Sequence, residues 1–233
     1  MANEIKFKIM LSKQQIKDFF ANEKVWSWFE LKIAKGGLRK DYYYNAVDKR
    51  DLVPSEIPIK RHRLDISFDA NKINAGRKKL VKYLLTDRFD EEELTEFGID
   101  YTVTCSYTEK SRHCVDGIER NEEFEYIVDD GDYNTKIYRE KMGEILDESK
   151  YYEWFKKKRK YLRVETKTDS SIHLEFSNIC SITFLEAEIV GTSGSDNARL
   201  KALEDLVSGL GFELKYETRS HRELIEEKLG KAS

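Results

Sequence analysis

The segment KKRKYLRV, residues 157–164, decides the fold because its charged and apolar residues alternate. Successive side chains of an extended strand point to opposite faces, so Leu162 and Val164 share one face while Arg159 and Arg163 share the other. A single strand of this kind is an ordinary surface strand with its polar face in water.

The same alternation recurs in other segments, with both signs of charge on the polar face. Arg61 and Arg63 occupy that face in one of them, and Glu186 and Glu188 occupy it in another. Several such strands, in a chain with helices to cover the apolar faces, predict an α+β fold: a closed antiparallel barrel with helices packed outside. Its interior would hold cations, carboxylates and a polyanion. The two segments are IKRHRLDISF, residues 59–68, and FLEAEI, residues 184–189.

The composition favours one domain over residues 1–233. The chain has only two prolines and no Gly/Ser-rich linker. The charged pattern over about 70–98 predicts a helical insertion that is too short to bury a core of its own. Charged residues make up 36% of the chain, yet the net charge is only -3. This balance argues against binding of duplex nucleic acid.

Neither a membrane protein nor a nitrogen and sulfur metal site is predicted. No stretch reaches the roughly 20 apolar residues of a membrane span, and the N-terminus MANEIKFKIM has no signal-peptide core, so we expect a soluble cytoplasmic protein. The three cysteines lack CxxC spacing and the four histidines are scattered. Any metal would therefore be held by carboxylates, which favours Mg or Mn.

Periodicity along the chain predicts alternating strands and helices. The expected strands lie at 4–10, 41–45, 59–68, 101–108, 122–128 and around Arg159, Ile172 and Glu186; the expected helices cover 12–22, 135 to about 154, 197–211 and 220–229.

The second half of the chain resembles the CYTH superfamily, the triphosphate tunnel metalloenzymes. The similarity rests on IHLEFSNICSITFLEAEIVG from Ile172, on LVSGLGF from Leu206 and on TRSHRELIEEKL from Thr218. Upstream, Asp41 to Tyr44 is similar to the family's DTYF segment, and the arginines and glutamates of the later strands follow in the family's order.

This resemblance implies an eight-stranded tunnel in which inward-facing cations bind a triphosphate and inward-facing glutamates bind Mg or Mn. The partner would be a triphosphate-bearing small molecule or an RNA 5' end, cleaved mainly by positioning and electrostatics. The implied metal ligands are Glu4, Glu186 and Glu188; the implied phosphate-binding residues are Lys8, Arg61, Arg63, Lys157, Arg159 and Arg163; the implied catalytic residues are Glu123, Glu125 and Arg159.

The N-terminal strand departs from the family pattern. Where the family has E-x-E-x-K, this chain has Glu4, Lys6 and Lys8, and Glu175 replaces the aspartate of the IHLD segment. The function we predict is metal-dependent hydrolysis of a triphosphate. Two alternatives stay open: an adenylyl cyclase of class IV type, and a catalytically impaired module that binds a nucleotide or polyphosphate. The sequence leaves the oligomeric state open.

Overall fold

The structure is a computed structural model that describes residues 2–47, 59–73, 75–128, 133–167, 171–191 and 195–230. Within these ranges the chain forms eight strands and seven helices. The strands are β1 (Ala2–Met10), β2 (Leu31–Ala46), β3 (Ile59–Asp69), β4 (Thr102–Val115), β5 (Ile118–Ile127), β6 (Tyr151–Thr166), β7 (Ile172–Ile179) and β8 (Ile182–Val190). The helices are α1 (Lys13–Ala21), α2 (Glu23–Trp28), α3 (Arg77–Leu85), α4 (Glu92–Glu96), α5 (Tyr133–Ile145), α6 (Asp196–Gly209) and α7 (His221–Lys228).

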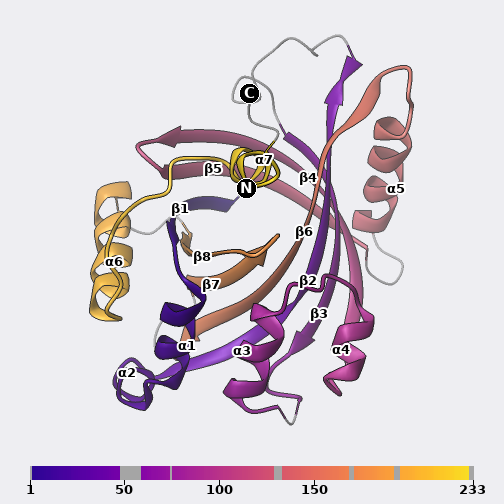
Figure 1. The fold of residues 1–233 in the computed structure, drawn as a ribbon. Coiled ribbons are helices and arrows are strands. Elements are labelled where there is room, and N and C mark those ends of the chain that lie inside the picture. The colour runs from indigo at the N-terminus through magenta and orange to yellow at the C-terminus, as the bar shows by residue number, and fades with distance from the viewer. Residues whose placement is uncertain are drawn as a thin grey trace.

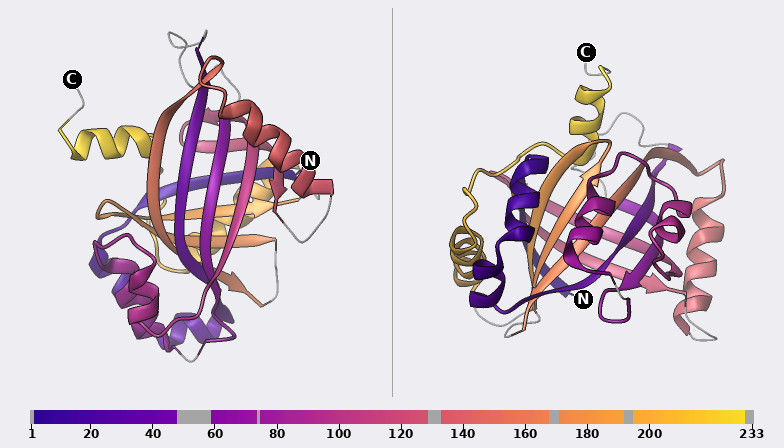
Figure 2. Two further views of the ribbon diagram at one scale, coloured as in Figure 1. Left: turned by 90° about the vertical axis from the view of Figure 1, so that its right-hand side faces the viewer. Right: turned by 60° about the horizontal axis from the view of Figure 1, so that its bottom comes forward.

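All strand pairs are antiparallel and form one sheet in the order β1-β5-β4-β3-β2-β6-β7-β8 (Figure 1). The sheet closes on itself because β1 pairs with β5 on one side and with β8 on the other. The long strands β2, β3 and β4 run side by side along one wall (Figure 2). The predicted α+β class and antiparallel sheet are confirmed.

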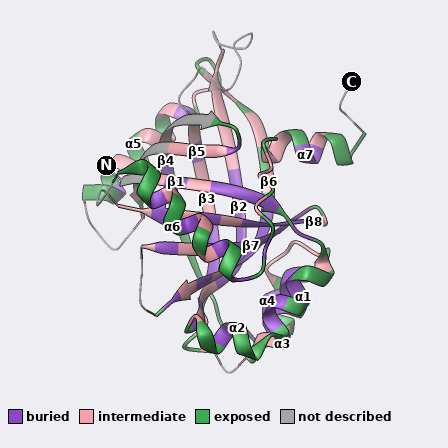
Figure 3. Ribbon diagram, turned by 90° about the vertical axis from the view of Figure 1, so that its left-hand side faces the viewer, coloured by how far each residue is buried: buried purple, intermediate pink, exposed green. Residues whose placement is uncertain are grey.

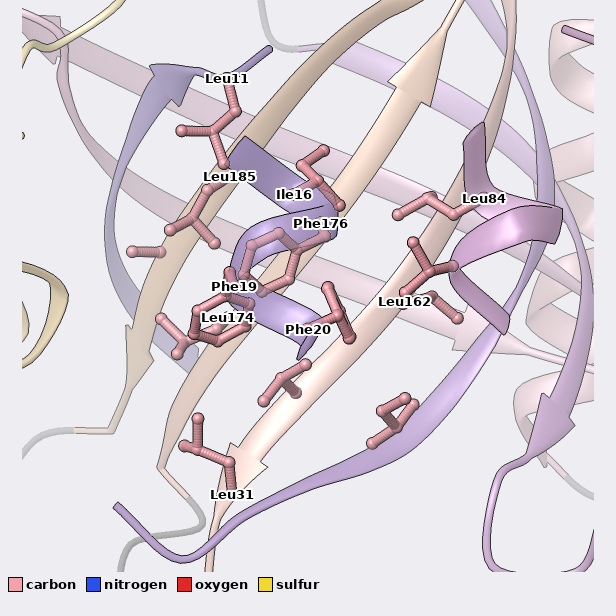
Figure 4. Close-up of a cluster of buried hydrophobic side chains, with 14 of the residues drawn as sticks. Leu11, Ile16, Phe19, Phe20, Leu31, Leu84, Leu162, Leu174, Phe176 and Leu185 are labelled. Carbon is pink, nitrogen blue, oxygen red and sulfur yellow. The ribbon is translucent and has the colours of Figure 1, made fainter. Parts of the chain in front are cut away.

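The apolar core lies between the outside of the barrel and the helices. Phe19 of α1 stacks on Phe176 of β7 with ring centroids 4.9 Å apart, and Ile16 joins them (Figure 4). Along several strands buried residues alternate with less buried ones, whereas the outer faces of the helices are exposed (Figure 3). Because the apolar side chains point outward to the helices, the charged side chains of the same strands point into the barrel.

The helices between β3 and β4 are fastened to the barrel by a buried cation. Lys160 projects outward from β6 and has no exposed surface; its ammonium group donates to the carbonyl oxygen of Tyr83 at 3.0 Å and pairs with Glu93. A buried charge is tolerated only with such partners. This contact fixes α3 and α4, which lie within residues 70–98, against the outside of the sheet.

Two sequence-based element boundaries were wrong. The helix predicted from Thr135 into the Trp154 region ends at Ile145, and β6 already begins at Tyr151. The aromatic residues there favour an extended strand. This strand pairs with the last residues of β2, where Ala46 lies opposite Tyr151. The strand predicted at 41–45 is the end of a much longer one, which begins at Leu31. No helix in the described part of the chain is long and apolar enough to cross a membrane.

Candidate anion-binding site inside the barrel

The inner wall of the barrel carries buried cations from four strands. Arg39 and Arg159, which face each other on β2 and β6, each expose 5% of their surface, and Arg61 of β3 exposes 8%. On each strand every second side chain points inward, so the residues two positions away from these arginines also face the interior. Arg63, Lys157 and Arg163 continue the same faces, and Lys6 and Lys8 project from β1.

Glu175 of β7 joins three of these guanidinium groups. Arg39 Nη1 donates to both its carboxylate oxygens at 2.9 and 2.7 Å, Arg159 Nη1 lies 3.0 Å away, and Arg163 Nη2 lies 3.7 Å away. Burial alone would raise the pKa of the Glu175 carboxyl, but the three arginines outweigh it and hold the pKa well below its ordinary value. Glu175 is therefore an internal counterion for the arginine cluster.

Asp41, two residues along β2 from Arg39, is a second buried counterion for these cations. Its carboxylate is fully buried, accepts a 2.7 Å hydrogen bond from Arg63 Nε and lies 3.8 Å from Lys157 Nζ. Burial would raise its pKa, yet Arg63, Arg61 and Lys157 keep the pKa well below normal. Asp41 therefore stays negatively charged and balances part of the positive charge of these side chains.

Lys157, His221 and Glu186 form a chain of contacts. Lys157 Nζ donates to His221 Nδ1 at 2.8 Å, and His221 Nε2 lies 3.3 Å from Glu186. Burial, followed by the nearby Lys157 cation, lowers the pKa of His221 to about 3, so this imidazole is neutral at pH 7. Burial, opposed by Asp41 and reinforced by Arg159, lowers the pKa of Lys157 to about 7. Lys157 is therefore a buried amine whose neighbours do not fully supply the negative charge it needs.

The sequence-based reasoning missed His221 and Arg39. His221 reaches the interior because α7 packs against the end of β8, where its ring stacks on Phe184 with centroids 4.9 Å apart. Its position within the TRSHRELIEEKL segment, which carried the family resemblance, was the available signal. Arg39 could have been found by extending the alternation of Asp41 and Tyr43 by one step toward the N-terminus.

The three predicted metal ligands lie on the interior face, but each is engaged by a cation or a ring nitrogen. Glu186 binds Arg159, Glu188 lies 3.1 Å from His173 Nδ1, and Glu4 lies 3.0 Å from Lys6 Nζ. Within the described ranges no group of three or more His, Cys, Asp or Glu side chains could hold a metal ion. The donor set in this arrangement does not fit a resident Mg or Mn.

The Lys6 ammonium lies near carboxylates of β1 itself and of its two neighbouring strands, β5 and β8. Burial would lower its pKa, but Glu4, Glu119, Glu186 and Glu188 together raise the pKa well above its ordinary value. Lys6 is therefore a permanent cation at the position where the family pattern has a glutamate.

The other predicted site residues differ from one another in burial and in their hydrogen-bond partners. Arg61 donates to the Thr108 hydroxyl at 2.9 Å, and Lys8 is buried and donates to the Arg219 carbonyl oxygen. Glu125 is exposed and accepts a 2.8 Å hydrogen bond from Ser106 Oγ. Glu123 belongs to β5, but its side chain lies outside the described part of the structure.

No protein-family model matches the chain, and no curated protein matches it by sequence. Solved structures match it over nearly the whole length. A conserved hypothetical protein from Pyrococcus furiosus is 18% identical, with a TM-score of 0.52 over 96% of this chain and 99% of that one. A protein from Pyrococcus horikoshii is 17% identical, with a TM-score of 0.52 over 97% and 99% of the two chains.

A Hippeastrum protein described as having a dominant triphosphatase activity is 16% identical, with a TM-score of 0.47 over 100% of this chain and 98% of that one. At these identities the structural matches establish the fold alone. The two Pyrococcus structures, with TM-scores of 0.52, therefore show that this chain shares their fold over nearly its whole length.

Proposed function

We propose that the interior of this barrel binds the triphosphate group of a small molecule or of an RNA 5' end. The observation that carries the proposal is the set of buried arginine and lysine side chains from β2, β3 and β6 that share one enclosed face. Guanidinium groups donate two parallel hydrogen bonds to phosphate oxygens, and such charge-assisted bonds are strong where water is excluded. The family resemblance of the sequence points to the same ligand.

The cations can accept an anion because some of their internal counterions are distant. Lys157 lies 3.8 Å from Asp41, and Arg163 lies 3.7 Å from Glu175. These contacts are longer than a charge-assisted hydrogen bond, so phosphate oxygens would replace weak partners rather than strong ones. The lowered pKa of Lys157, caused mainly by burial, indicates the same shortage of negative charge.

Metal-dependent hydrolysis of a triphosphate is the second candidate, with the substrate being a nucleotide, thiamine triphosphate, an RNA 5' end or tripolyphosphate. Its support is that Glu186 and Glu188 share the interior face of β8, as the family resemblance implies. Mg or Mn would first have to take these carboxylates from Arg159 and His173. An adenylyl cyclase of class IV type would instead release pyrophosphate and form a cyclic nucleotide.

Binding is tested by titrating the full chain with tripolyphosphate in EDTA and measuring heat and thermal stabilisation. We expect saturable binding that orthophosphate does not reproduce, and a loss of about tenfold or more in affinity in Arg61→Gln. Lys60→Gln is the matched control, because Lys60 is the neighbouring residue on β3 and pairs outside the barrel with Glu144. Absence of binding, or equal effects of the two substitutions, would overturn the proposal.

Turnover is tested separately with Mg or Mn and a panel of triphosphates. Release of phosphate from tripolyphosphate, ATP, thiamine triphosphate or 5'-triphosphate RNA identifies a hydrolase, and formation of cyclic AMP from ATP identifies a cyclase. Binding without either product supports a protein that holds the triphosphate without cleaving it.

A further inference from the structure

The ammonium group of Lys6 lies among the carboxylates that were expected to bind a metal. Its Nζ is 3.0 Å from a Glu4 oxygen and 3.7 Å from a Glu119 oxygen. In the register of β1 and β8, Lys6 stands directly opposite Glu188, and the next inward residue on β8 is Glu186. Four carboxylates from three adjacent strands therefore surround one side chain.

Carboxylates can be gathered inside a barrel only when a cation balances them, because burial disfavours unpaired charge. A divalent ion supplies that charge when it is bound through several oxygens at short distances. A lysine side chain supplies it permanently, with three N–H donors at ordinary hydrogen-bond distances. Lys6 has the second kind of geometry, since its side chain is largely buried and its nearest oxygen lies at 3.0 Å.

One further cation and two histidine rings also engage these carboxylates. Glu186 is bound by Arg159 and approached by His221, and Glu188 is contacted by His173. An incoming metal ion would meet the Lys6 ammonium at the centre of its ligands, so it would have to overcome both the repulsion of like charges and the loss of these pairs.

We infer that the Lys6 ammonium takes the place of the divalent cation inside this barrel, which makes the carboxylate cluster a metal-free counterion site. Resting on the proposed function, the inference adds that the polyphosphate binds through arginines and lysines alone, with no divalent ion required. Lys6 thereby separates this chain from a tunnel in which a glutamate at the same position helps to bind a metal.

The test measures Mn²⁺ binding to the full chain without phosphate, by electron paramagnetic resonance and calorimetry. We expect no interior Mn²⁺ site in the natural chain, and one site in Lys6→Glu with affinity at least about tenfold higher than any residual binding. The double substitution of Lys6→Glu with Glu4→Gln should lose that gain, since it removes one of the carboxylates that would bind the Mn²⁺. Circular dichroism and thermal unfolding establish that the variants are folded.

A natural chain that binds one Mn²⁺, with the binding abolished in Glu186→Gln, would overturn the inference. A folded Lys6→Glu variant that gains no Mn²⁺ binding would overturn it as well. If Lys6→Glu does not fold, Lys6→Gln gives the same test, because it removes the ammonium without adding a like charge to the carboxylates. These measurements need no polyphosphate, so a failure of tripolyphosphate to bind would count against the proposed function and leave the Mn²⁺ result to decide the role of Lys6.

Discussion

Lys157 is a buried side chain whose charge state a bound anion can change. It is buried beside Asp41 and His221, and burial brings its pKa to about 7. A lysine in water stays charged far above this pH. The interior therefore contains an amine that gains or loses its proton near neutrality.

Triphosphate binding should depend on pH through this amine. A bound anion stabilises the protonated ammonium, so affinity should be highest below pH 7 and should fall as the pH rises above it. In Lys157→Met this part of the pH dependence should disappear, while the ligand's own ionisation affects both proteins alike. Calorimetric titrations with tripolyphosphate from pH 6 to pH 9 measure the difference, and identical profiles for the two proteins would contradict the role of Lys157.

Glu175 is the carboxylate on which the arginine cluster depends when no ligand is bound. Replacing it in Glu175→Gln leaves Arg39 and Arg159 buried without their main counterion, which should cost about 3–5 kcal/mol of unfolding free energy. Tripolyphosphate should recover much of this loss, because phosphate oxygens replace the missing charge. Urea unfolding with and without ligand measures both effects.

The control for Glu175 is Glu91→Gln, which removes an outer partner of Lys40 and should change stability by at most about 1 kcal/mol. A ligand-induced stabilisation of Glu175→Gln no larger than that of the natural chain would show that the arginines do not receive the anion.

Inward-facing residues could be predicted from the sequence, but their partners could not. Alternation with a period of two assigns Arg61, Arg159 and Glu186 to one face whatever the rest of the chain does. The pairing of Arg39 with Glu175 joins residues 136 positions apart. It depends on the register of two intervening strand pairs, which local patterns do not fix.

Among the elements, β2 is constrained by Gly37 where it pairs with β3. Gly37 has a φ of +156°, and a Cβ there would stand 2.1 Å from the Ile66 carbonyl oxygen and 2.8 Å from the Ser67 Cα. The backbones of the two strands therefore approach so closely that no side chain fits between them.

Gly37→Ala should lower the free energy of unfolding by about 2–4 kcal/mol, because it adds backbone strain and a clash that the sheet cannot relieve. Gly143→Ala is the matched control. Gly143 lies in α5 with open space around it, so alanine should stabilise the helix by about 0.5–1 kcal/mol. Chemical denaturation of both variants measures the contrast, and a neutral Gly37→Ala would contradict the close approach of β2 and β3.

Element types followed local patterns more faithfully than element lengths did. The capping box of α1, with Ser12 and Gln15, marks its start in the sequence as in the structure. The length of β2 and β6 could not be predicted, since each strand extends as far as its neighbour supplies hydrogen-bond partners. Tyr151 belongs to a strand because Ala46 lies across from it.

At the scale of the whole molecule, the buried arginines of β2, β3 and β6 gather inside the barrel, where carboxylates balance much of their charge, and the chain as a whole is slightly acidic, with a net charge of -3. Duplex nucleic acid binds mainly through phosphates spread along an extended basic surface. The proposed ligand, a single terminal triphosphate, would instead meet the cations on the inner face of the barrel.

We expect 5'-triphosphate RNA to bind more tightly than the same RNA with a 5'-hydroxyl, and duplex DNA to show no binding at about 0.15 M salt. Fluorescence anisotropy with labelled oligonucleotides measures all three. Equal binding of the two RNAs would place recognition on the outer surface instead of in the interior.

The double pairing of β1 has a consequence for how the protein is made. Glu4 of β1 pairs with Val190 of β8, so β1 must wait for the last of the described strands before the sheet can close. Contacts this distant in the chain slow folding, and until they form, the edge of β1 that faces β8 is open to pairing with other chains. Nascent molecules stalled before β8 should therefore be the ones that recruit chaperones and aggregate.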